Sequence, residues 1–126
     1  MPTFVHNYIV KNYGCYIGAK SNIGRGVKFP HPTGIVIGAG VKIGKGCTIY
    51  QQVTFGGKVV GDALQEHYPQ VGDNVTIFSG AKLIGNIIIG DSVVIGANSV
   101  VNSDVPSFTV VAGVPARVIK KIQDVK

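Results

Sequence analysis

The chain of 126 residues has three histidines, and one of them, His31, lies between two prolines. A histidine exchanges its proton near neutral pH, so it is a common general base in group-transfer reactions. Pro30 and Pro32 fix their own φ angles and lack backbone donors, which predicts a rigid corner that holds the imidazole outside any regular element. We expect His31 to carry the chemistry, with His67 as a second candidate and His6 without a role. On position alone, a solvated turn histidine is the competing interpretation for both candidates.

Both candidate histidines interrupt a repeat of six residues that fills most of the chain. Large apolar residues recur at every sixth position in three series, from Ile17 to Phe29, from Ile37 to Phe55 and from Val71 to Val101. Glycine follows most of them. A small or β-branched residue stands four places after them, at Ser21, Val27, Thr33, Val41, Cys47, Val53, Val75, Ala81, Ile87, Val93, Ser99 and Val105. Such a fixed short period is typical of an all-β fold, the hexapeptide parallel β-helix.

The interruptions of the repeat divide this single predicted domain into segments. We expect an N-terminal cap over residues 1–16, hexad coils over 17–57 and 71–105, a projecting loop over 58–70, and a closing segment and tail over 106–126. Within the tail, residues 117–126 are expected to form a short helix. Caps at both ends are needed because an open β-helix end exposes unpaired strand edges.

Composition limits the classes of function. The chain has a net charge of +6, but its basic residues are scattered through the repeats without interleaved aromatic residues, so a nucleic-acid partner is not expected. No apolar run approaches the length of about 18 residues that spans a bilayer, so no membrane insertion is expected. Cys15 and Cys47 are too few for a disulfide framework, which favours a cytoplasmic location. Because a prism of this size is thin, we expect three copies to pack as a cyclic homotrimer.

Four blocks of the sequence resemble the serine acetyltransferase family. They are residues 31–38 (HPTGIVIG), 49–57 (IYQQVTFGG), 79–86 (SGAKLIGN) and 112–118 (AGVPARV), in the order that the family shows. The resemblance implies a trimer of left-handed β-helices that binds acetyl-CoA in the groove between neighbouring subunits. It also implies that His31 is the general base that activates an acceptor hydroxyl for attack on the thioester.

The same resemblance suggests roles for further residues. Backbone N–H groups of Gly56 and Gly57 would stabilise the oxyanion, and plain corner glycines are the alternative interpretation. Coenzyme A would contact Ser79, Gly80, Ala81, Lys82 and Ala97, whose mostly small side chains leave room for the pantetheine arm. The nucleotide phosphates would meet Arg117 with Lys120 or Lys121, and a solvated cationic tail is the alternative interpretation of the two lysines.

The sequence departs from the family pattern where the acceptor would bind. The family has an acid directly before the catalytic histidine and another fifteen positions earlier, but this chain has Pro30 and Tyr16 there. In the loop, Tyr68 stands where the family has a histidine before the proline, and His67 is displaced by one position. Tyr16 is therefore a candidate for the role of the missing orienting acid.

The missing acids bear on the identity of the acceptor. Of the six acids in the chain, only Asp62 and Glu66 lie in the predicted loop. A zwitterionic amino acid needs a carboxylate partner for its ammonium group, whereas a sugar hydroxyl does not. We therefore expect a sugar or polysaccharide precursor as acceptor, with serine as the alternative.

Two functions of other classes compete with acetyl transfer. A metal-dependent hydratase on the same architecture, of the γ-carbonic anhydrase type, needs three imidazoles around one metal, and only His31 and His67 are expected near a cleft. No metal site is therefore expected. A non-catalytic β-helix that serves as a scaffold is the other alternative, but a scaffold has no need of a histidine held between two prolines.

Overall fold

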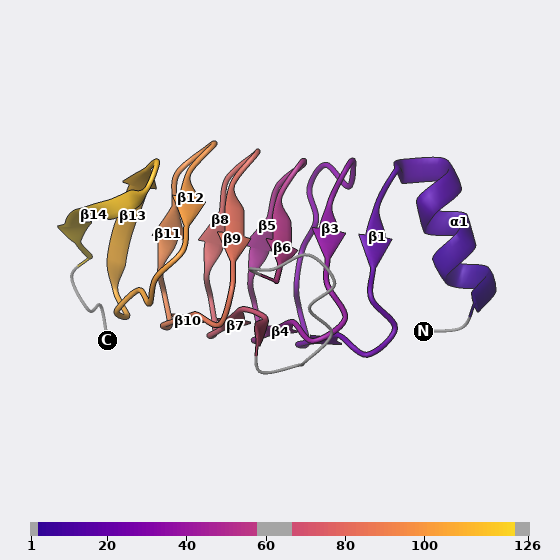
Figure 1. Cartoon of the computed structure of the whole chain (residues 1–126), viewed down its shortest axis with the longest axis horizontal. Coiled ribbons are helices and arrows are strands. Elements are labelled where there is room, and N and C mark those ends of the chain that lie inside the picture. The colour runs from indigo at the N-terminus through magenta and orange to yellow at the C-terminus, as the bar shows by residue number, and fades with distance from the viewer. Residues whose placement is uncertain (1–2, 58–66, 123–126) are drawn as a thin grey trace.

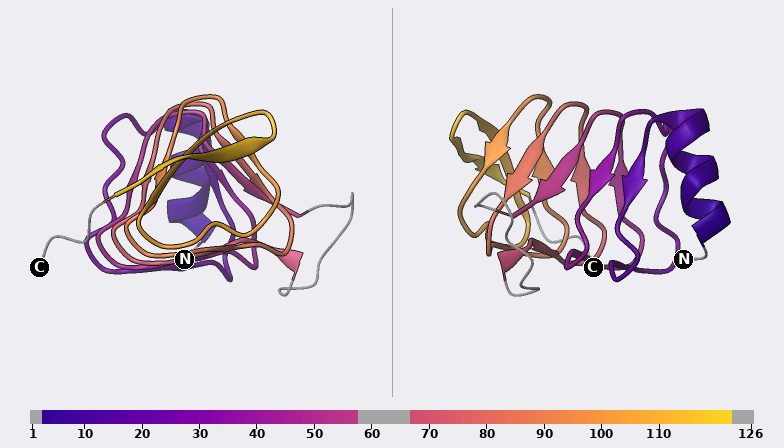
Figure 2. Two further views of the ribbon diagram at one scale, coloured as in Figure 1. Left: turned by 90° about the vertical axis from the view of Figure 1, so that its left-hand side faces the viewer. Right: turned by 45° about the vertical axis from the view of Figure 1, so that its right-hand side comes forward.

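The computed structural model describes residues 3–57 and 67–122. The described chain winds as a parallel β-helix, with a helix at its N-terminal end and a hairpin at its C-terminal end (Figure 1). Each coil passes through three sheets, which gives the molecule a triangular outline when it is viewed along its axis (Figure 2). None of the described helices is long and apolar enough to cross a membrane.

Each of the three sheets collects one short strand from successive coils. Sheet A contains, in spatial order, β1 (Tyr16–Ile17), β3 (Val36–Ile37), β6 (Thr54–Gly56), β9 (Lys82–Ile84) and β12 (Val100–Val101). Sheet B contains β10 (Ile88–Ile89), β7 (Gln70–Val71), β4 (Lys42–Ile43) and β2 (Asn22–Ile23). Sheet C contains β14 (Ala116–Lys121), β13 (Thr109–Gly113), β11 (Val94–Ile95), β8 (Thr76–Ile77) and β5 (Thr48–Ile49). Neighbouring strands pair in parallel, except that β14 is antiparallel to β13.

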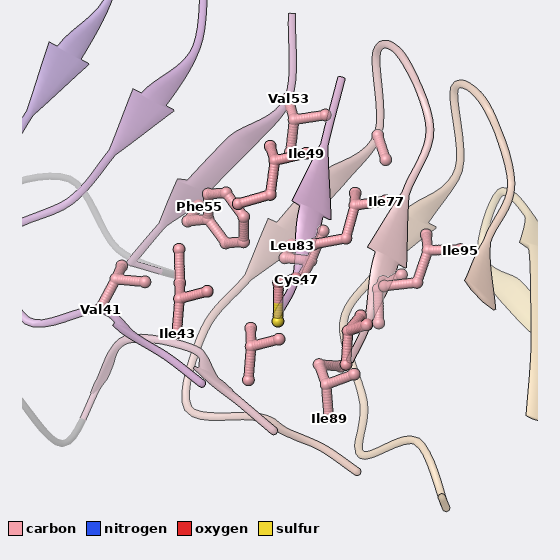
Figure 3. Packing of buried hydrophobic residues seen from close by; sticks show 14 of the residues in the cluster. Val41, Ile43, Cys47, Ile49, Val53, Phe55, Ile77, Leu83, Ile89 and Ile95 are labelled. Atoms are coloured by element: carbon pink, nitrogen blue, oxygen red, sulfur yellow. The ribbon is translucent and has the colours of Figure 1, made fainter. Parts of the chain in front are cut away.

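The hexad residues fill the interior of the prism. From Ile37 to Val101, the described apolar residues at every sixth position are buried, and they pack in columns between the three sheets (Figure 3). The first coil is less enclosed, because Ile17, Ile23 and Phe29 are only partly buried. The core is therefore built by stacking equivalent positions of successive coils, as the repeat predicts.

The predicted repeat is wrong at one position. By its spacing Thr33 continues the series of small residues, but its side chain is exposed. Ile35 takes the inward position instead and is 1% exposed. The reason is the two-residue insertion between Phe29 and Ile37, which shifts the phase of the repeat. The extra residues leave the prism as a bulge, and the apolar residue closest to the next strand turns inward.

The two ends of the prism are closed differently. Helix α1 (Thr3–Tyr13) forms the predicted N-terminal cap (Figure 1). At the other end the helix expected over 117–126 is wrong, because residues 116–121 form β14. Pairing with β13 supplies partners for an otherwise open sheet edge, and the β-branched Val118 and Ile119 favour a strand. Residues 123–126 lie outside the described part of the chain.

The three corners of the triangle give the molecule three edges. The site edge joins sheet C to sheet A and contains residues 30–34, 50–52, 78–80 and 96–98. The opposite edge joins sheet A to sheet B and contains residues 18–21, 38–41, 57, 67–69, 85–87 and 102–104. The third edge joins sheet B to sheet C and contains residues 24–27, 44–47, 72–75, 90–93 and 106–108. Of the predicted loop over 58–70, residues 58–66, which include Asp62 and Glu66, lie outside the described residues.

Candidate active site

His31 lies exposed in the bulge that leaves the prism on the site edge. The bulge is braced by short backbone hydrogen bonds, because the Thr33 N–H donates to the His31 carbonyl oxygen at 2.8 Å and the Gly34 N–H donates to the Tyr13 carbonyl oxygen at 3.1 Å. Gly34 has a φ of 64°, a left-handed conformation that suits glycine. The backbone that carries the imidazole is thus held from both sides, as the flanking prolines predict.

Successive coils are joined along the site edge. Three backbone hydrogen bonds run from Gln52 N–H to Thr33 O at 2.9 Å, from Gly80 N–H to Gln51 O at 3.0 Å, and from Asn98 N–H to Ser79 O at 2.9 Å. The structure therefore brings His31, Ser79, Gly80 and Ala97 onto one edge, with the layer of residues 50–52 between His31 and Ser79. Ala81 belongs to the same corner but is fully buried, so its side chain packs in the core and its backbone alone can face a ligand.

Gly80 has a packing reason to be glycine. Its φ is 76°, and a Cβ at this position would collide with the Asn98 side chain of the next coil. The same left-handed corner position is occupied by Gln52 and Asn98, with φ values of 63° and 57°. The third edge has the same conformation at Asn74, Ser92 and Phe108, so these left-handed residues belong to the corner geometry of the coil.

Lys82 directs its charge onto the site edge. Its ammonium Nζ donates to the Gly80 carbonyl oxygen at 2.7 Å and to the Gln52 carbonyl oxygen at 3.3 Å. A lysine ammonium carries three N–H donors, so one donor remains for a ligand. Lys82 therefore stabilises two corners of the edge and also provides a positive charge there.

The site edge also carries two aromatic residues that the sequence reasoning missed. The rings of Tyr50 and Phe78 stack with centroids 5.1 Å apart and planes 11° apart, and the Tyr50 ring lies 6.2 Å from the His31 ring. Both residues directly follow an inward apolar residue of the repeat. At this place many other hexads have glycine, for example Gly18 and Gly38. This gap in the glycine column is the sequence signal that could have found them.

Gly56, Gly57 and His67 lie away from His31. Gly56 ends β6, and its carbonyl oxygen accepts the Gly85 N–H at 2.9 Å, which places the pair at the opposite edge, across sheet A from the site edge. A Cβ on Gly56 would meet nothing closer than 3.8 Å, so internal packing does not demand glycine there. His67 is half-buried on the same opposite edge. One protomer therefore does not bring these candidates together with His31.

The displaced loop histidine has a structural cause. The Tyr68 ring lies directly against Gly38, where any Cβ would collide with it, and it packs on the core. Tyr68 therefore fills a structural position before Pro69. His67 consequently occupies the last position before the ring that anchors the segment.

Arg117, Lys120 and Lys121 lie on β14, and all three are exposed. Arg117 pairs with Ala112, near the end of β13 that meets the site edge, whereas Lys120 and Lys121 pair with Val110 and Thr109 at its other end. Arg117 also lines a pocket of about 170 Å³ at the C-terminal end of the prism. Of the three, Arg117 lies nearest to the column of candidate residues.

The surroundings of His31 contain few charges in the described part of the chain. Tyr16 starts β1, one layer from the bulge, and is 46% exposed. The described carboxylates lie elsewhere: Asp73 and Asp91 accept backbone N–H groups on the third edge, and Asp104 accepts the Ile88 N–H beside sheet B. Among residues 3–57 and 67–122, no group of His, Cys, Asp and Glu is placed to hold a metal ion.

Two hollows on the described surface lie away from His31. A groove of about 430 Å³ runs along the outer face of sheet B, and a pocket of about 350 Å³ lies at the opposite edge between Ile84, Asn86 and Asn102. Neither is lined by His31 or Ser79.

Comparison with known proteins places this geometry in a family. Residues 68–103 match the family pattern described as bacterial transferase hexapeptide (six repeats). The chain is 45% identical over 108 residues to a serine acetyltransferase of Staphylococcus xylosus, which covers 86% of this chain and 49% of that protein. It superposes on the crystal structure of Neisseria gonorrhoeae serine acetyltransferase with a TM-score of 0.89 and 36% identity, covering 97% of this chain and 46% of that one. The chain is a serine acetyltransferase-like member of the hexapeptide-repeat superfamily.

A second solved serine acetyltransferase, in complex with CoA, superposes with a TM-score of 0.83 and 40% identity over 92% of this chain and 46% of that one. Together with the geometry, these likenesses confirm the predicted all-β fold and its left-handed winding. The chain spans about half the length of these serine acetyltransferase relatives. The relatives are named for serine, so the predicted preference for a sugar acceptor is not supported.

Proposed function

We propose that this chain is an acetyl-CoA-dependent O-acetyltransferase whose acceptor is the hydroxyl group of serine. The observation that carries the proposal is the site edge, where His31 lies two coils away from Ser79, Gly80 and the ammonium group of Lys82. The likeness to serine acetyltransferases, one of them in complex with CoA, supports the choice of donor and acceptor. The cytoplasm is the compartment that fits its two buried free thiols.

The reaction needs one base and one oxyanion site. The unprotonated nitrogen of the His31 imidazole takes the proton from the acceptor hydroxyl while the oxygen attacks the acetyl carbonyl carbon. The tetrahedral intermediate then collapses, the carbon–sulfur bond breaks, and the imidazolium returns the proton to the leaving thiolate of CoA. The products are the acetyl ester and free CoA. Backbone N–H groups stabilise the oxygen that becomes negative in between.

Coenzyme A would lie along the site edge. From the layer of His31 to the hairpin that carries Arg117 the prism rises by four coils, about 19 Å at the usual strand spacing. In our proposal the thioester lies at His31, the pantetheine arm passes Ser79, Gly80 and the backbone of Ala81 and Ala97, and the remaining N–H of Lys82 contacts the ligand. The phosphates meet Arg117, with Lys120 and Lys121 contributing long-range attraction.

The complete site needs two protomers. Gly56, Gly57 and His67 lie on the opposite edge and His31 lies on the site edge, so a single chain separates the proposed oxyanion donors from the base. In a cyclic homotrimer, each opposite edge can meet the site edge of a neighbour. We therefore propose that the active sites lie between protomers, with His31 from one subunit and Gly56, Gly57 and His67 from the next.

The acceptor pocket is where this chain departs from the family pattern. With Pro30 and Tyr16 in place of two acids, the serine ammonium group must be bound by other groups than in the pattern. Tyr16 remains a candidate for orienting the His31 ring. Unchanged turnover in Tyr16→Phe would remove it from that role.

The test is the release of CoA thiol from acetyl-CoA by the purified protein, with serine, free sugars and nucleotide-sugars offered separately. Mass spectrometry of the product identifies the acetylated oxygen. We expect kcat/KM to be highest for serine. Acetylation of a sugar with serine left untouched would overturn the choice of acceptor, and no thiol release above background with any acceptor would favour a non-catalytic scaffold.

A further inference from the structure

An aromatic column underlies the candidate base. Tyr50 and Phe78 follow the inward residues Ile49 and Ile77 on two successive coils, and their rings stack almost in parallel, with planes 11° apart. The His31 ring stands next in line, 6.2 Å from the Tyr50 ring and tilted by 38°. The repeat has glycine at the corresponding position of the following coil, Gly96, so the column consists of these three rings.

The His31 side chain has no other partner in the described structure. Within residues 3–57 and 67–122 it makes no hydrogen bond or ion pair, and the carboxylates described there lie on other edges. A catalytic histidine usually has its ring oriented by a hydrogen-bonded acid or carbonyl. Here the described neighbour is an aromatic ring.

We propose that Tyr50, held in place by Phe78, is a positioning residue that orients the His31 imidazole through its ring face. This inference rests on the proposed function, because it assigns the pair a role in the same reaction. An aromatic face restricts the rotamers of an adjacent imidazole and attracts the imidazolium that forms when the proton is taken up. The ring pair thereby takes over part of the work of the acid that the family pattern places beside the histidine.

The role belongs to the ring of Tyr50 and not to its hydroxyl. Within the described chain the Tyr50 hydroxyl makes no hydrogen bond, whereas its ring contacts both neighbours. Tyr50→Phe should therefore keep the function and Tyr50→Leu should lose it. Tyr50 is half-buried on the outside of the prism, so both variants are expected to fold.

Kinetics of acetyl transfer provide the first test. Tyr50→Leu should lower kcat roughly tenfold, on the scale of a misoriented catalytic group, with the KM for acetyl-CoA unchanged within about twofold. Phe78→Leu should lower kcat about threefold, because Tyr50 keeps its ring but loses its support. Tyr50→Phe should match the wild-type protein. Phe4→Leu is the control, since it removes an aromatic ring that is 75% exposed on α1, and it should leave kcat unchanged.

Nuclear magnetic resonance of histidine-labelled protein provides a second test that does not need activity. The ring-proton shifts of His31 should change in Tyr50→Leu and stay close to wild type in Tyr50→Phe, because the ring current comes from the aromatic face. Equal kcat in Tyr50→Leu and wild type would overturn the proposal, and so would equal losses in Tyr50→Leu and Tyr50→Phe. A wild-type protein without activity would contradict the proposed function, while unaltered His31 shifts in Tyr50→Leu would contradict the ring contact itself.

Discussion

The amide of Gly34 donates a hydrogen bond of 3.1 Å to the carbonyl oxygen of Tyr13, the last residue of α1. This bond ties the end of the N-terminal cap to the bulge that carries His31. Because Gly34 also lies against the side chain of Gln52 on the next coil, the bulge is fixed by the layers on both sides. The cap is therefore part of the support of the site as well as a cover for the end of the prism.

Replacing Gly34 by alanine should lower both the unfolding free energy and kcat, and a control glycine shows which effect comes from the site. The φ of 64° should cost Gly34→Ala about 1–2 kcal/mol of unfolding free energy, because an L-residue is disfavoured there. The new Cβ should also push the Gln52 side chain aside and lower kcat several-fold. Gly14→Ala is the matched control, since its φ is 62° with open space around the Cβ position. Denaturant unfolding and thiol release would measure both; an unchanged kcat in Gly34→Ala contradicts the prediction.

We predict that close packing between coils requires glycine at position 80. Gly80→Ala should lose about 2 kcal/mol of unfolding free energy, from left-handed strain and from the collision with Asn98. In an Asn98→Gly background the loss should shrink by about 1 kcal/mol, which a double-mutant cycle detects. Gly46→Ala on the third edge is the control, because it meets Asn74 in the same way. Gly46→Ala should lose a similar unfolding free energy and leave the KM for acetyl-CoA unchanged. Additive losses of Gly80→Ala and Asn98→Gly in the double-mutant cycle would refute the packing explanation.

Lys82 should matter for the donor substrate. Lys82→Met removes the ammonium that contacts the carbonyl oxygens of Gly80 and Gln52, and with it the positive charge on the site edge. We expect the KM for acetyl-CoA to rise about fivefold to tenfold, as when a charged hydrogen bond to the ligand is lost. Lys42→Met, at the equivalent start of β4 on sheet B, should leave it unchanged. Steady-state kinetics would decide, and equal KM values for the two variants would speak against a donor role.

The unfolding free energy should depend on pH through the thiol of Cys47. Burial raises the pKa of this thiol above its ordinary value of 9.0, and the carboxylates of Asp73 and Asp91 add to the increase. Since the folded-state pKa is above the unfolded one, the contribution to stability is complete below pH 9 and declines as pH rises through the folded-state pKa. Unfolding free energy should thus fall above about pH 9 in wild type and less steeply in Cys47→Ala.

Thiol modification would check the same prediction. Alkylation at pH 8, followed by mass-spectrometric mapping, should leave Cys47 unmodified in the folded protein and modify it rapidly in denaturant. Rapid labelling of folded Cys47 would show that the thiol is accessible, contrary to its 0% exposure.

The six-residue repeat could be predicted because it depends only on a fixed spacing in the sequence. Each inward residue, such as Ile49 or Leu83, stands one coil away from an equivalent residue, so a fixed spacing in the sequence translates into a column in space. The phase was lost only at the insertion, where Thr33 and Ile35 compete for one inward position. The spacing alone does not say which of them turns in.

The helix expected over 117–126 was wrong because β14 and its partner β13 form a hairpin that lies outside the hexad pattern. Residues 118–121 are two apolar residues followed by two lysines, a pattern that suits a short helix or a strand, and pairing with β13 decides in favour of the strand. The N-terminal cap was likewise expected without a secondary structure. Local preferences are weak there, and the tertiary contacts determine the outcome.

The sequence suggested candidate site residues but not how they are arranged. His31, Ser79 and Gly80 share one edge, whereas Gly56 and His67 lie on another, a division that depends on which corner each hexad reaches. Tyr50 and Phe78 could not be predicted as a pair, because the absence of glycine at these two positions does not by itself indicate that their rings meet. Their stacking is a consequence of coil spacing, which brings equivalent side chains to about 4.8 Å.

The most direct measurement of the central claim compares acetyl transfer by wild type and His31→Asn, with the CoA dissociation constant determined by calorimetry on the same preparations. A base that accepts the acceptor proton should be worth about 10²–10⁴-fold in kcat. We predict a loss of that size in His31→Asn with CoA affinity unchanged within about twofold, because the bulge backbone stays in place. Wild-type turnover in His31→Asn would contradict the account.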